Sequence, residues 1–313
     1  MKKISIVVPC YNEAENILAM SKALTAVMAP YNDKYEYEII FIENCSTDNT
    51  RSIIRQICKG DERIKAIFNI RNFGPFNSPY YGLLQSTGDC AILFSADFQD
   101  PLNMISKFIE EWENGYKIVI GQKTSSKENH LMYMLRSCYY KLIKAFSDIQ
   151  QIEHFTGFGL YDKQFLEVLR SLKDPMPFLR GLVAELGAGL KIIPYEQQKR
   201  RAGKSSYNFM RYYDAAMLGF TSYTKIGLRV ATFIGVGVAV LSLLIAIVYF
   251  ILKLIYWDKF VAGISPILIG IFFLGAIQLM FLGIMGEYIL NINIREMNRP
   301  LVVEEERINF KSS

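Results

Sequence analysis

Apolar residues in the first hundred positions form short runs that alternate with longer segments in which apolar residues recur at helical spacing. The short runs predict strands at residues 4–8, 38–42, 64–69 and 90–94. The longer segments predict helices at residues 16–27, 47–58 and 78–86, and one beyond Pro101. Strands that alternate with helices indicate an α/β domain with a mostly parallel sheet.

The last third of the chain contains two uncharged apolar stretches, residues 230–252 and 261–286. Each exceeds the about 20 apolar residues that an α-helix needs to cross a bilayer. A pair of buried core helices is the alternative, but soluble domains seldom need two such runs so close together. The pattern therefore predicts a two-helix transmembrane hairpin, and with it an integral membrane protein.

Positive charge flanks this hairpin on its outer sides, while the connecting segment carries only Lys253, Asp258 and Lys259. The flanking cations are Lys204, Arg211, Lys225, Arg229, Arg295, Arg299, Arg307 and Lys311. Because Lys and Arg are enriched on the cytoplasmic side, both termini and the amino-terminal domain are predicted to be cytoplasmic, at the plasma (inner) membrane. The first predicted strand begins directly after Lys3, which leaves too short an apolar run for a signal peptide.

These patterns divide the chain into four predicted parts. They are a cytosolic α/β domain (1–205), an interfacial juxtamembrane helix (206–225), two transmembrane helices (226–290) and a cytosolic tail (291–313). The interfacial helix is expected because aromatic and aliphatic residues mix with Arg211 and Asp214 in this region, as they do in helices that lie at a membrane surface.

Composition narrows the classes of function. The 313 residues carry a net charge of +5 and are 51% hydrophobic, so the soluble part can bury a substantial core. Five cysteines show no paired metal-ligand spacing, and we expect ordinary reduced thiols. With only 2 histidines a histidine-rich metal site is not expected, and no separate basic stripe suggests nucleic acid. A homo-oligomer is compatible with the sequence.

Polar residues cluster where each of the four predicted strands ends, and parallel strands bring these ends to one edge of a sheet. Each cluster alone fits a turn followed by a helix cap, which is the simpler role for Ser46 or Asp48. All four together predict a ligand site at this edge. The clusters are Pro9-Cys10-Tyr11-Asn12-Glu13, Glu43-Asn44-Cys45-Ser46-Thr47-Asp48, Arg71-Asn72-Phe73-Gly74 and Ser95-Ala96-Asp97-Phe98-Gln99-Asp100-Pro101.

On these clusters the amino-terminal domain resembles a family-2 glycosyltransferase with the GT-A fold, which binds nucleotide-diphosphate sugars. With the two apolar stretches and the late Gly286-Glu287-Tyr288 and Asn298-Arg299-Pro300, the whole chain resembles polyprenyl-phosphate glycosyltransferases, relatives of dolichyl-phosphate mannose synthase and bactoprenol glucosyltransferase.

The resemblance implies an inverting hexosyltransferase that moves a sugar from a nucleotide donor, expected to be UDP-linked, to a polyprenyl phosphate. The transfer would take place at the cytoplasmic membrane face and supply a surface polysaccharide. Two alternatives remain open: extension of a lipid-linked saccharide, and a non-catalytic membrane scaffold.

A metal site is expected at the end of the fourth predicted strand. Asp97 ends this strand, and Gln99 points the same way if the chain stays extended. Oxygen ligands of this kind suit Mg²⁺ or Mn²⁺, and the resemblance implies the same role for both residues. A helix-entry cap is the alternative for Asp97. Relatives commonly have an aspartate where this chain has Ser95, and Asp100 fits helix entry better than it fits replacement of that carboxylate.

The resemblance also implies which residues bind the nucleotide sugar. They are Pro9, Tyr11, Asn12, Glu13, Glu43, Asn44, Arg71, Ala96, Asp97 and Lys204. Asn44 is neutral where relatives often carry a second acidic residue, so it can both donate and accept hydrogen bonds. Arg71 lies where a cation could meet phosphate, although a structural arginine fits this place equally well.

Four residues are implied in catalysis and phosphate binding, namely Asp97, Arg136, Arg200 and Ser205. The basic segment 198–207 precedes the membrane, and guanidinium groups bind phosphate oxygens in bidentate fashion. A polybasic segment that rests on anionic lipid is the alternative. Arg136 lies in a helical stretch, 130–146, that resembles the acceptor-side helix of the family.

Gly157 and Gly159 stand where several relatives have an aspartate and an arginine. A sugar hydroxyl that attacks needs a base to remove its proton. A phosphate monoester, whose second ionisation lies at about pH 6, already carries an oxyanion. The missing carboxylate is therefore compatible with a lipid-phosphate acceptor.

Overall fold

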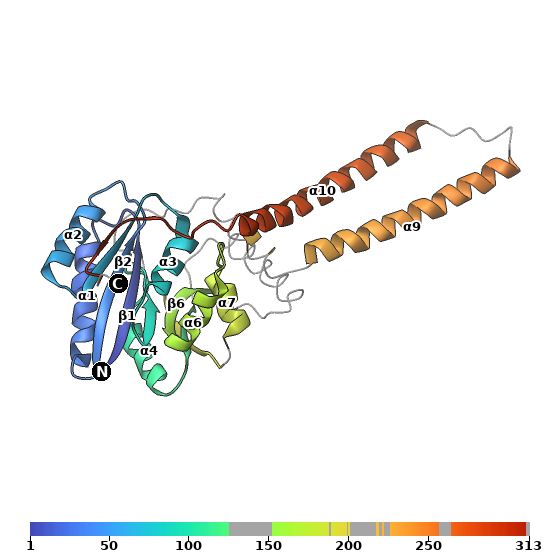
Figure 1. Cartoon of the computed structure of the whole chain (residues 1–313). Coiled ribbons are helices and arrows are strands. Elements are labelled where there is room, and N and C mark those ends of the chain that lie inside the picture. Colours follow the sequence, from blue (N-terminus) through green and yellow to red (C-terminus); the bar gives the residue numbers. More distant parts are fainter. Residues whose placement is uncertain are drawn as a thin grey trace.

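A sheet of eight strands in the order β7-β5-β6-β4-β1-β2-β3-β8 forms the centre of the computed structural model (Figure 1). The structure describes residues 1–124, 152–187, 189–198, 200, 217–218, 221, 226–256 and 264–310. The strands are β1 (Lys2–Cys10), β2 (Tyr35–Glu43), β3 (Ile64–Asn69), β4 (Cys90–Leu93), β5 (Ile118–Lys123), β6 (Phe155–Asp162), β7 (Lys191–Tyr195) and β8 (Glu304–Ile308). The first four match the strands expected from the sequence.

Most neighbouring strands in this sheet run parallel. β1 lies parallel to β2 and to β4, β2 lies parallel to β3, and β5 lies parallel to β7. β6 is antiparallel to both of its neighbours, β4 and β5, and β8 is antiparallel to β3. The predicted α/β fold with a mostly parallel sheet is confirmed.

Helices cover both faces of the sheet and create two hydrophobic cores. One core lies under α1 (Ile17–Met28), α2 (Thr50–Gly60) and α4 (Asn103–Glu113). The other lies under α3 (Gly74–Leu84), α6 (Lys163–Leu172) and α7 (Leu179–Leu186). Along β1, Ile6 and Val8 belong to the first core and Val7 to the second, because successive side chains of a strand point to opposite faces. This double burial explains why the central strands are continuously apolar.

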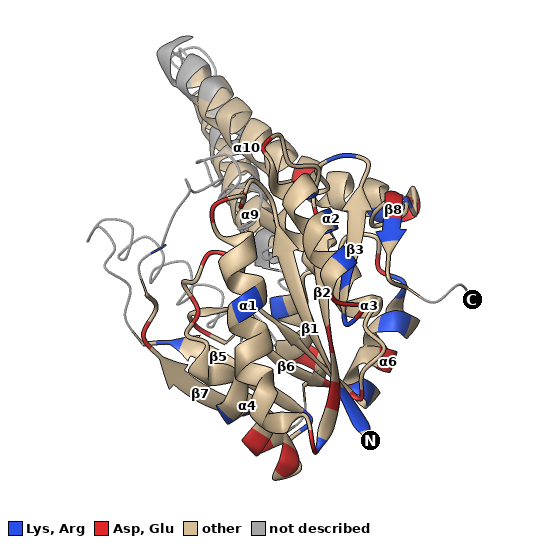
Figure 2. Cartoon of the chain, turned by 90° about the vertical axis from the view of Figure 1, so that its left-hand side faces the viewer, with Lys and Arg blue, Asp and Glu red and all other residues tan. Residues whose placement is uncertain are grey.

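The carboxyl-terminal segment is part of this sheet, which corrects the expectation of a separate tail from residue 291 onward. β8 pairs with β3 over four residue pairs, from Ala66 with Ile308 to Asn69 with Glu304. Figure 2 shows β8 beyond β3 at the edge of the sheet, with its ribbon coloured for both acidic and basic residues. Two ion pairs attach it to α2, since Arg51 and Arg55 each lie 2.7 Å from a carboxylate of β8.

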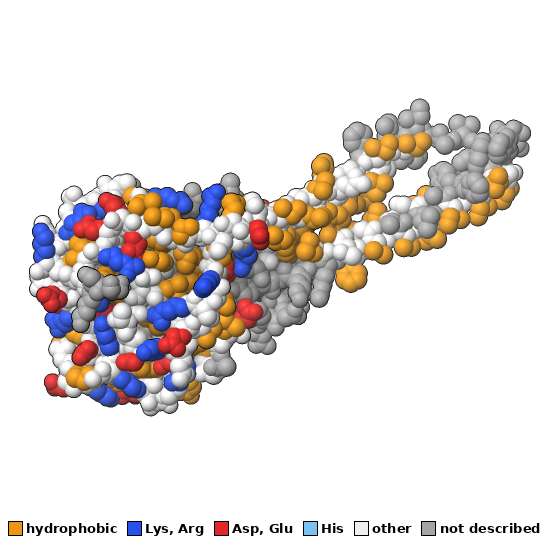
Figure 3. Space-filling model, in the orientation of Figure 1, with side chains coloured by type: hydrophobic (Ala, Val, Ile, Leu, Met, Phe, Trp, Pro, Cys, Tyr) orange, Lys and Arg blue, Asp and Glu red, His pale blue; other side chains and the backbone are white. Residues whose placement is uncertain are grey.

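Two long helices, α9 (Ile226–Ile255) and α10 (Ile264–Glu296), project side by side away from the sheet and its covering helices, which we call the head (Figure 1). Hydrophobic side chains dominate their visible surface in Figure 3, whereas charged side chains gather on the head. By length and composition, 1 helical segment among the described residues, Phe273–Glu296, could cross a membrane. The apolar part of α9, Val230–Ser242, is shorter, so the fold contains the expected pair of helices but a membrane hairpin is not established.

Candidate active site

A cavity of about 260 Å³ opens at the edge of the sheet where β1 and β4 end. The ends of these strands and the loops that follow them form one part of its wall, as expected for an α/β sheet, and α3, β6 and α7 form most of the rest. Its lining comprises Pro9, Cys10, Tyr11, Glu13, Asn44, Gly74, Pro75, Phe76, Ser78, Pro79, Tyr80, Leu93, Ser95, Ala96, Asp97, Thr156, Phe158, Phe178, Leu179, Arg180 and Arg200. Seven of the predicted site residues therefore share this one cavity: Pro9, Tyr11, Glu13, Asn44, Ala96, Asp97 and Arg200.

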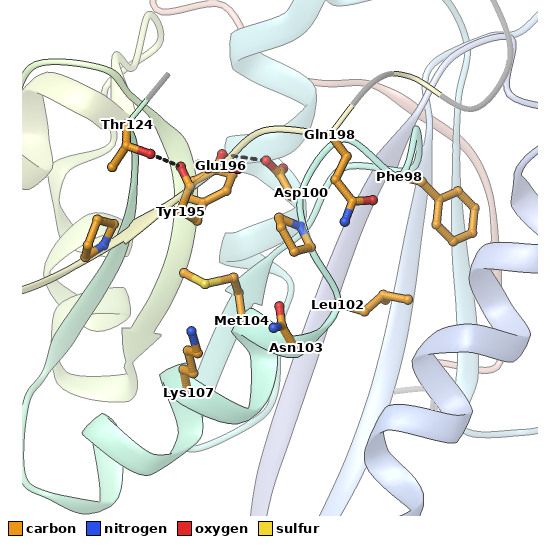
Figure 4. A pocket seen from close by; sticks show the side chains of 12 residues that line it. Phe98, Asp100, Leu102, Asn103, Met104, Lys107, Thr124, Tyr195, Glu196 and Gln198 are labelled. Carbon is orange, nitrogen blue, oxygen red and sulfur yellow. Dashed lines mark hydrogen bonds between the residues drawn. The ribbon is translucent and has the colours of Figure 1, made fainter. Parts of the chain in front are cut away.

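A larger hollow of about 700 Å³ lies between the start of α4 and the end of β7, and Figure 4 shows the residues that line it. None of the predicted site residues lines this hollow. Its wall includes Thr124 and Gln198, which directly precede stretches outside the described residues. We therefore place the candidate active site in the smaller cavity.

Arg200 lies between two carboxylates in this cavity. Its Nη2 donates to Oδ2 of Asp97 at 2.9 Å, and its Nη1 lies 3.8 Å from Oε1 of Glu13. Burial raises the pKa of Glu13, and the negative charge of Asp97 raises it further, while a hydrogen bond from Asn16 and the charge of Arg200 lower it. One cation thus compensates two nearly buried acids. The fold brings together Asp97 and Arg200, which the sequence separates by 103 positions.

The backbone turns directly after Asp97, so the extended chain assumed for Gln99 is wrong. Phe98 is left-handed, with φ of 59°, and the backbone N–H of Gln99 donates back to Oδ1 of Asp97 at 3.2 Å. Gln99 does not line the cavity. Asp100 is buried on the other side of this turn, where Oδ1 accepts a hydrogen bond of 2.6 Å from Tyr195, and both residues line the larger hollow in Figure 4. Asp100 is therefore structural, and Glu13 is the second carboxylate beside Asp97.

Asn12 joins the loops that follow β1 and β2 and does not line the cavity. Its φ of 56° is left-handed, a conformation that asparagine tolerates better than most residues. Its backbone N–H donates to Ser46 Oγ at 2.9 Å, and its side-chain oxygen accepts from the N–H of Thr47 at 2.8 Å. Through these contacts Asn12 holds the two loops together. Its role in nucleotide binding stays a prediction.

Glu43 and Arg71, both predicted to bind the nucleotide sugar, lie outside the cavity lining. Glu43 is fully buried, with Oε2 2.5 Å from Arg51 Nε and Oε1 bound to the N–H of Ser46. Both of its oxygens are occupied, so the position does not fit the expected contact with base or ribose. Arg71 stacks on Phe73, with its guanidinium carbon 4.3 Å from the ring centre. The structural alternative fits Arg71.

Asn44 uses its whole amide to hold the loop that leads into α3. Its Nδ2 donates to Asn72 Oδ1 at 3.0 Å and to the carbonyl of Gly74 at 3.2 Å. Its Oδ1 accepts from Asn69 Nδ2 at 3.0 Å and from the N–H of Phe73 at 2.9 Å. An aspartate could accept the second pair of bonds but could not donate the first. This network gives Asn44 a structural role that an acidic residue could not fill.

Backbone conformation at Gly157 and close packing at Gly159 account for these two glycines of β6. Gly157 has a φ of +98°, which disfavours any other residue, and at Gly159 a Cβ atom would lie 2.6 Å from the carbonyl oxygen of Val119. No side chain fits at Gly159 without movement of the backbone. Packing within the sheet therefore accounts for the glycine at this position.

Arg180 lines the cavity but was not predicted from the sequence. The site was predicted from the polar residues at the carboxyl ends of four parallel strands, whereas Arg180 lies on α7. β6, which packs against α7, is antiparallel, so its beginning and not its end reaches the cavity, at Thr156 and Phe158. Pro177-Phe178-Leu179-Arg180, an apolar segment that ends in a cation, is the sequence signal that could have indicated it.

Three predicted site residues, Arg136, Lys204 and Ser205, lie outside the described residues, as does most of the predicted interfacial helix. Their assignments stay predictions.

The donor set of the cavity fits a divalent cation that shares its coordination with a ligand. No group of three or more His, Cys, Asp or Glu side chains suitable for a metal occurs among the described residues. Asp97 and Glu13 nevertheless face one cation already, the guanidinium of Arg200. Mg²⁺ is commonly bound by one or two carboxylates together with substrate phosphates, and two carboxylates are what this wall offers.

Comparison with known proteins agrees with this geometry. The model of the family described as glycosyl transferase family 2 matches residues 5–170. The bactoprenol glucosyl transferase of Shigella phage SfX is 32% identical over 308 residues, which cover 97% of this chain and 99% of that protein. The putative glycosyltransferase CsbB of Bacillus subtilis (strain 168) is 32% identical over 309 residues, which cover 98% of this chain and 93% of that protein.

Among solved structures, mannosyl-3-phosphoglycerate synthase from Rubrobacter xylanophilus superposes with a TM-score of 0.50. The two sequences are 14% identical over the aligned part, which covers 69% of this chain and 71% of that one. This likeness shows a shared fold alone.

The Asn44 network predicts the effect of an acidic residue at this position. Asn44→Asp removes two donated bonds and places carboxylate oxygens against Asn72 Oδ1 and the carbonyl of Gly74, so the free energy of unfolding should fall by about 1–3 kcal/mol. Thermal unfolding of the purified full chain in detergent measures the change, with the exposed Asn32→Asp as the matched control. Equal midpoints for the two variants would show that the network does not depend on the amide.

Proposed function

The chain belongs to glycosyl transferase family 2, and on that premise we propose that it transfers a sugar from a nucleoside-diphosphate donor, expected to carry UDP, to a polyprenyl phosphate. The observation that carries the proposal is the meeting of Asp97, Glu13 and Arg200 in one cavity at the edge of the sheet. The printed names of the full-length relatives, bactoprenol glucosyl transferases, support the lipid acceptor. The expected extension of a lipid-linked saccharide has no comparable support.

The charges in the cavity suit the departure of a diphosphate. In the proposed reaction, an oxygen of the lipid phosphate attacks the anomeric carbon, and the bond from that carbon to the donor diphosphate breaks with its electron pair. A single displacement of this kind inverts the anomeric configuration. Arg200 can leave Asp97 for the phosphate oxygens, because a guanidinium binds phosphate as well as carboxylate in bidentate fashion. A phosphate monoester needs no general base above about pH 6.

Asp97 and Glu13 are the residues that would hold Mg²⁺ or Mn²⁺ in this cavity, and Gln99 stays a weaker candidate because its side chain does not line the wall. A bound divalent cation would stabilise the negative charge that develops on the leaving diphosphate. Pro9 and Tyr11 form the part of the wall that lies next to Glu13, and we assign them to the nucleotide. Asn44 supports this wall through the loop that leads into α3.

The place of β8 supports two membrane crossings. β8 belongs to the same sheet as β1, so the chain must return to the side from which it leaves. It can therefore cross a bilayer only an even number of times between β7 and β8. If α10 crosses, α9, with its 30 residues, is the partner helix, because at 1.5 Å per residue it exceeds the about 30 Å of a hydrocarbon core. The flanking cations favour the cytoplasm for the head and for β8.

Loss of the Asp97 carboxylate should abolish most of the transfer. With labelled UDP-sugar and polyprenyl phosphate in nanodiscs, Asp97→Asn is expected to lower the rate at which label enters the lipid fraction by at least about a hundredfold. Asp33→Asn, an exposed substitution of the same chemistry that precedes β2, serves as control. Undiminished transfer by Asp97→Asn would show that Asp97 is not part of the catalytic centre. Label that appears only on added lipid-linked saccharide would assign the extension reaction instead.

An even number of membrane crossings between β7 and β8 predicts which positions can be labelled from outside the cell. In a chain without its native cysteines, Lys259→Cys between α9 and α10 should react with a membrane-impermeant maleimide in intact cells. Glu305→Cys in β8 should react only after the membrane is permeabilised. Reaction of Glu305→Cys in intact cells, or protection of Lys259→Cys there, would contradict the two-crossing arrangement.

A further inference from the structure

Arg180 is a cavity-lining cation without an acidic partner among the residues that the structure describes. Its guanidinium carbon lies 5.1 Å from the ring centre of Phe178 and 5.8 Å from that of Phe76. The two rings meet edge to face, with their centres 5.9 Å apart. Aromatic faces stabilise a cation but do not neutralise it, so Arg180 keeps its charge available to an anion in the cavity.

The other arginine of the cavity differs in this respect. Arg200 faces the carboxylates of Asp97 and Glu13, and its charge is compensated in the absence of a ligand. Arg180 makes no ion pair of this kind within the described part of the chain. A guanidinium at the wall of a half-apolar cavity gains most from an anion that it can bind through two parallel hydrogen bonds, such as a phosphate.

The wall that carries Arg180 lies on the side of the head next to α10. Asp174, in the segment between α6 and α7, lies with Oδ2 3.0 Å from Nη1 of Arg295 in the last turn of α10. Figure 1 shows α6 and α7 on the side of the head from which α9 and α10 project. Pro9 and Tyr11, which we assign to the nucleotide, lie at the end of β1 and directly after it. A phosphate that arrives from a lipid would therefore meet Arg180, and the donor diphosphate would meet Arg200.

We propose that Arg180 binds the phosphate of the acceptor lipid, and that Phe76 and Phe178 hold its guanidinium in place and contact the first prenyl carbons. The assignment rests on the proposed function and deepens it, because it gives the two phosphate groups of the reaction separate arginines. Arg180 is thus a binding residue for the acceptor, whose phosphate it turns toward the donor carbon beside Asp97.

Kinetics of the full chain in nanodiscs test the assignment. Arg180→Gln should raise the KM for polyprenyl phosphate by about tenfold to a hundredfold and leave the KM for the nucleotide sugar within about twofold. Arg180→Lys keeps the charge but loses the planar guanidinium that donates two parallel hydrogen bonds. Its KM for polyprenyl phosphate should therefore lie between those of Arg180→Gln and the unchanged chain. Arg63→Gln removes a similar cation near the amino end of β3, far from the cavity, and should change neither constant.

Two results would overturn the assignment. One is an unchanged KM for polyprenyl phosphate in Arg180→Gln. The other is a raised KM for the nucleotide sugar, which would place Arg180 on the donor diphosphate.

A direct binding measurement separates this inference from the proposed function. The full chain is titrated with a short-chain prenyl phosphate, and inorganic phosphate is used as the comparison ligand. Tight binding by the unchanged chain and weak binding by Arg180→Gln support the assignment even if no sugar transfer is observed, which would count against the proposed function alone. Equal binding by both chains contradicts the role of Arg180 whether or not transfer occurs. If inorganic phosphate binds with the same affinity as the prenyl phosphate, the assignment of the bound phosphate to a lipid is contradicted.

Discussion

The contact of Arg200 with Asp97 and Glu13 is the interaction on which the site depends. Two carboxylates that are 6% and 8% exposed would repel each other without a cation between them. Arg200 supplies this charge from the segment that follows β7, just before the basic stretch that leads toward α9. In the proposed reaction, a diphosphate with a divalent cation would satisfy the same two acids and the same guanidinium. The resting charge balance and the proposed chemistry are therefore two uses of one arrangement.

The return of the chain into its own sheet adds a second constraint. β8 closes the edge beside β3, and Arg51 connects it to the site, since this arginine contacts Glu305 in β8, Glu43 at the end of β2 and the backbone carbonyl of Asn69. The loops behind the cavity thus depend on residues that follow both long helices. Along the chain, the two long helices therefore lie between β7 and β8, two strands of the same sheet.

Local patterns in the sequence predicted the first half of the head well. The runs that became β1 to β4 are buried on both faces, so their hydrophobicity is continuous, and the polar clusters after them meet because the strands are parallel. The same reasoning could not find β8, whose sequence EEERI resembles a solvated tail; this strand pairs with β3 at the sheet edge, and its glutamates form ion pairs with arginines of α2. It also missed Arg180, which lies on α7 beside the antiparallel strand β6 and does not follow the end of a parallel strand. The roles of Glu43 and Asn44 depend on which neighbours each one meets, and that is a property of the folded loops.

The chemical identity of the lipid product tests the account most directly. The purified full chain is given UDP-sugar and a polyprenyl phosphate whose phosphate carries an oxygen isotope label, and the lipid is analysed by mass spectrometry and phosphorus NMR. The account predicts one added hexose, complete retention of the label, a single phosphorus converted from monoester to diester, and an anomeric configuration opposite to that of the donor. A product with two phosphorus atoms, or donor hydrolysis without any new lipid, would contradict it.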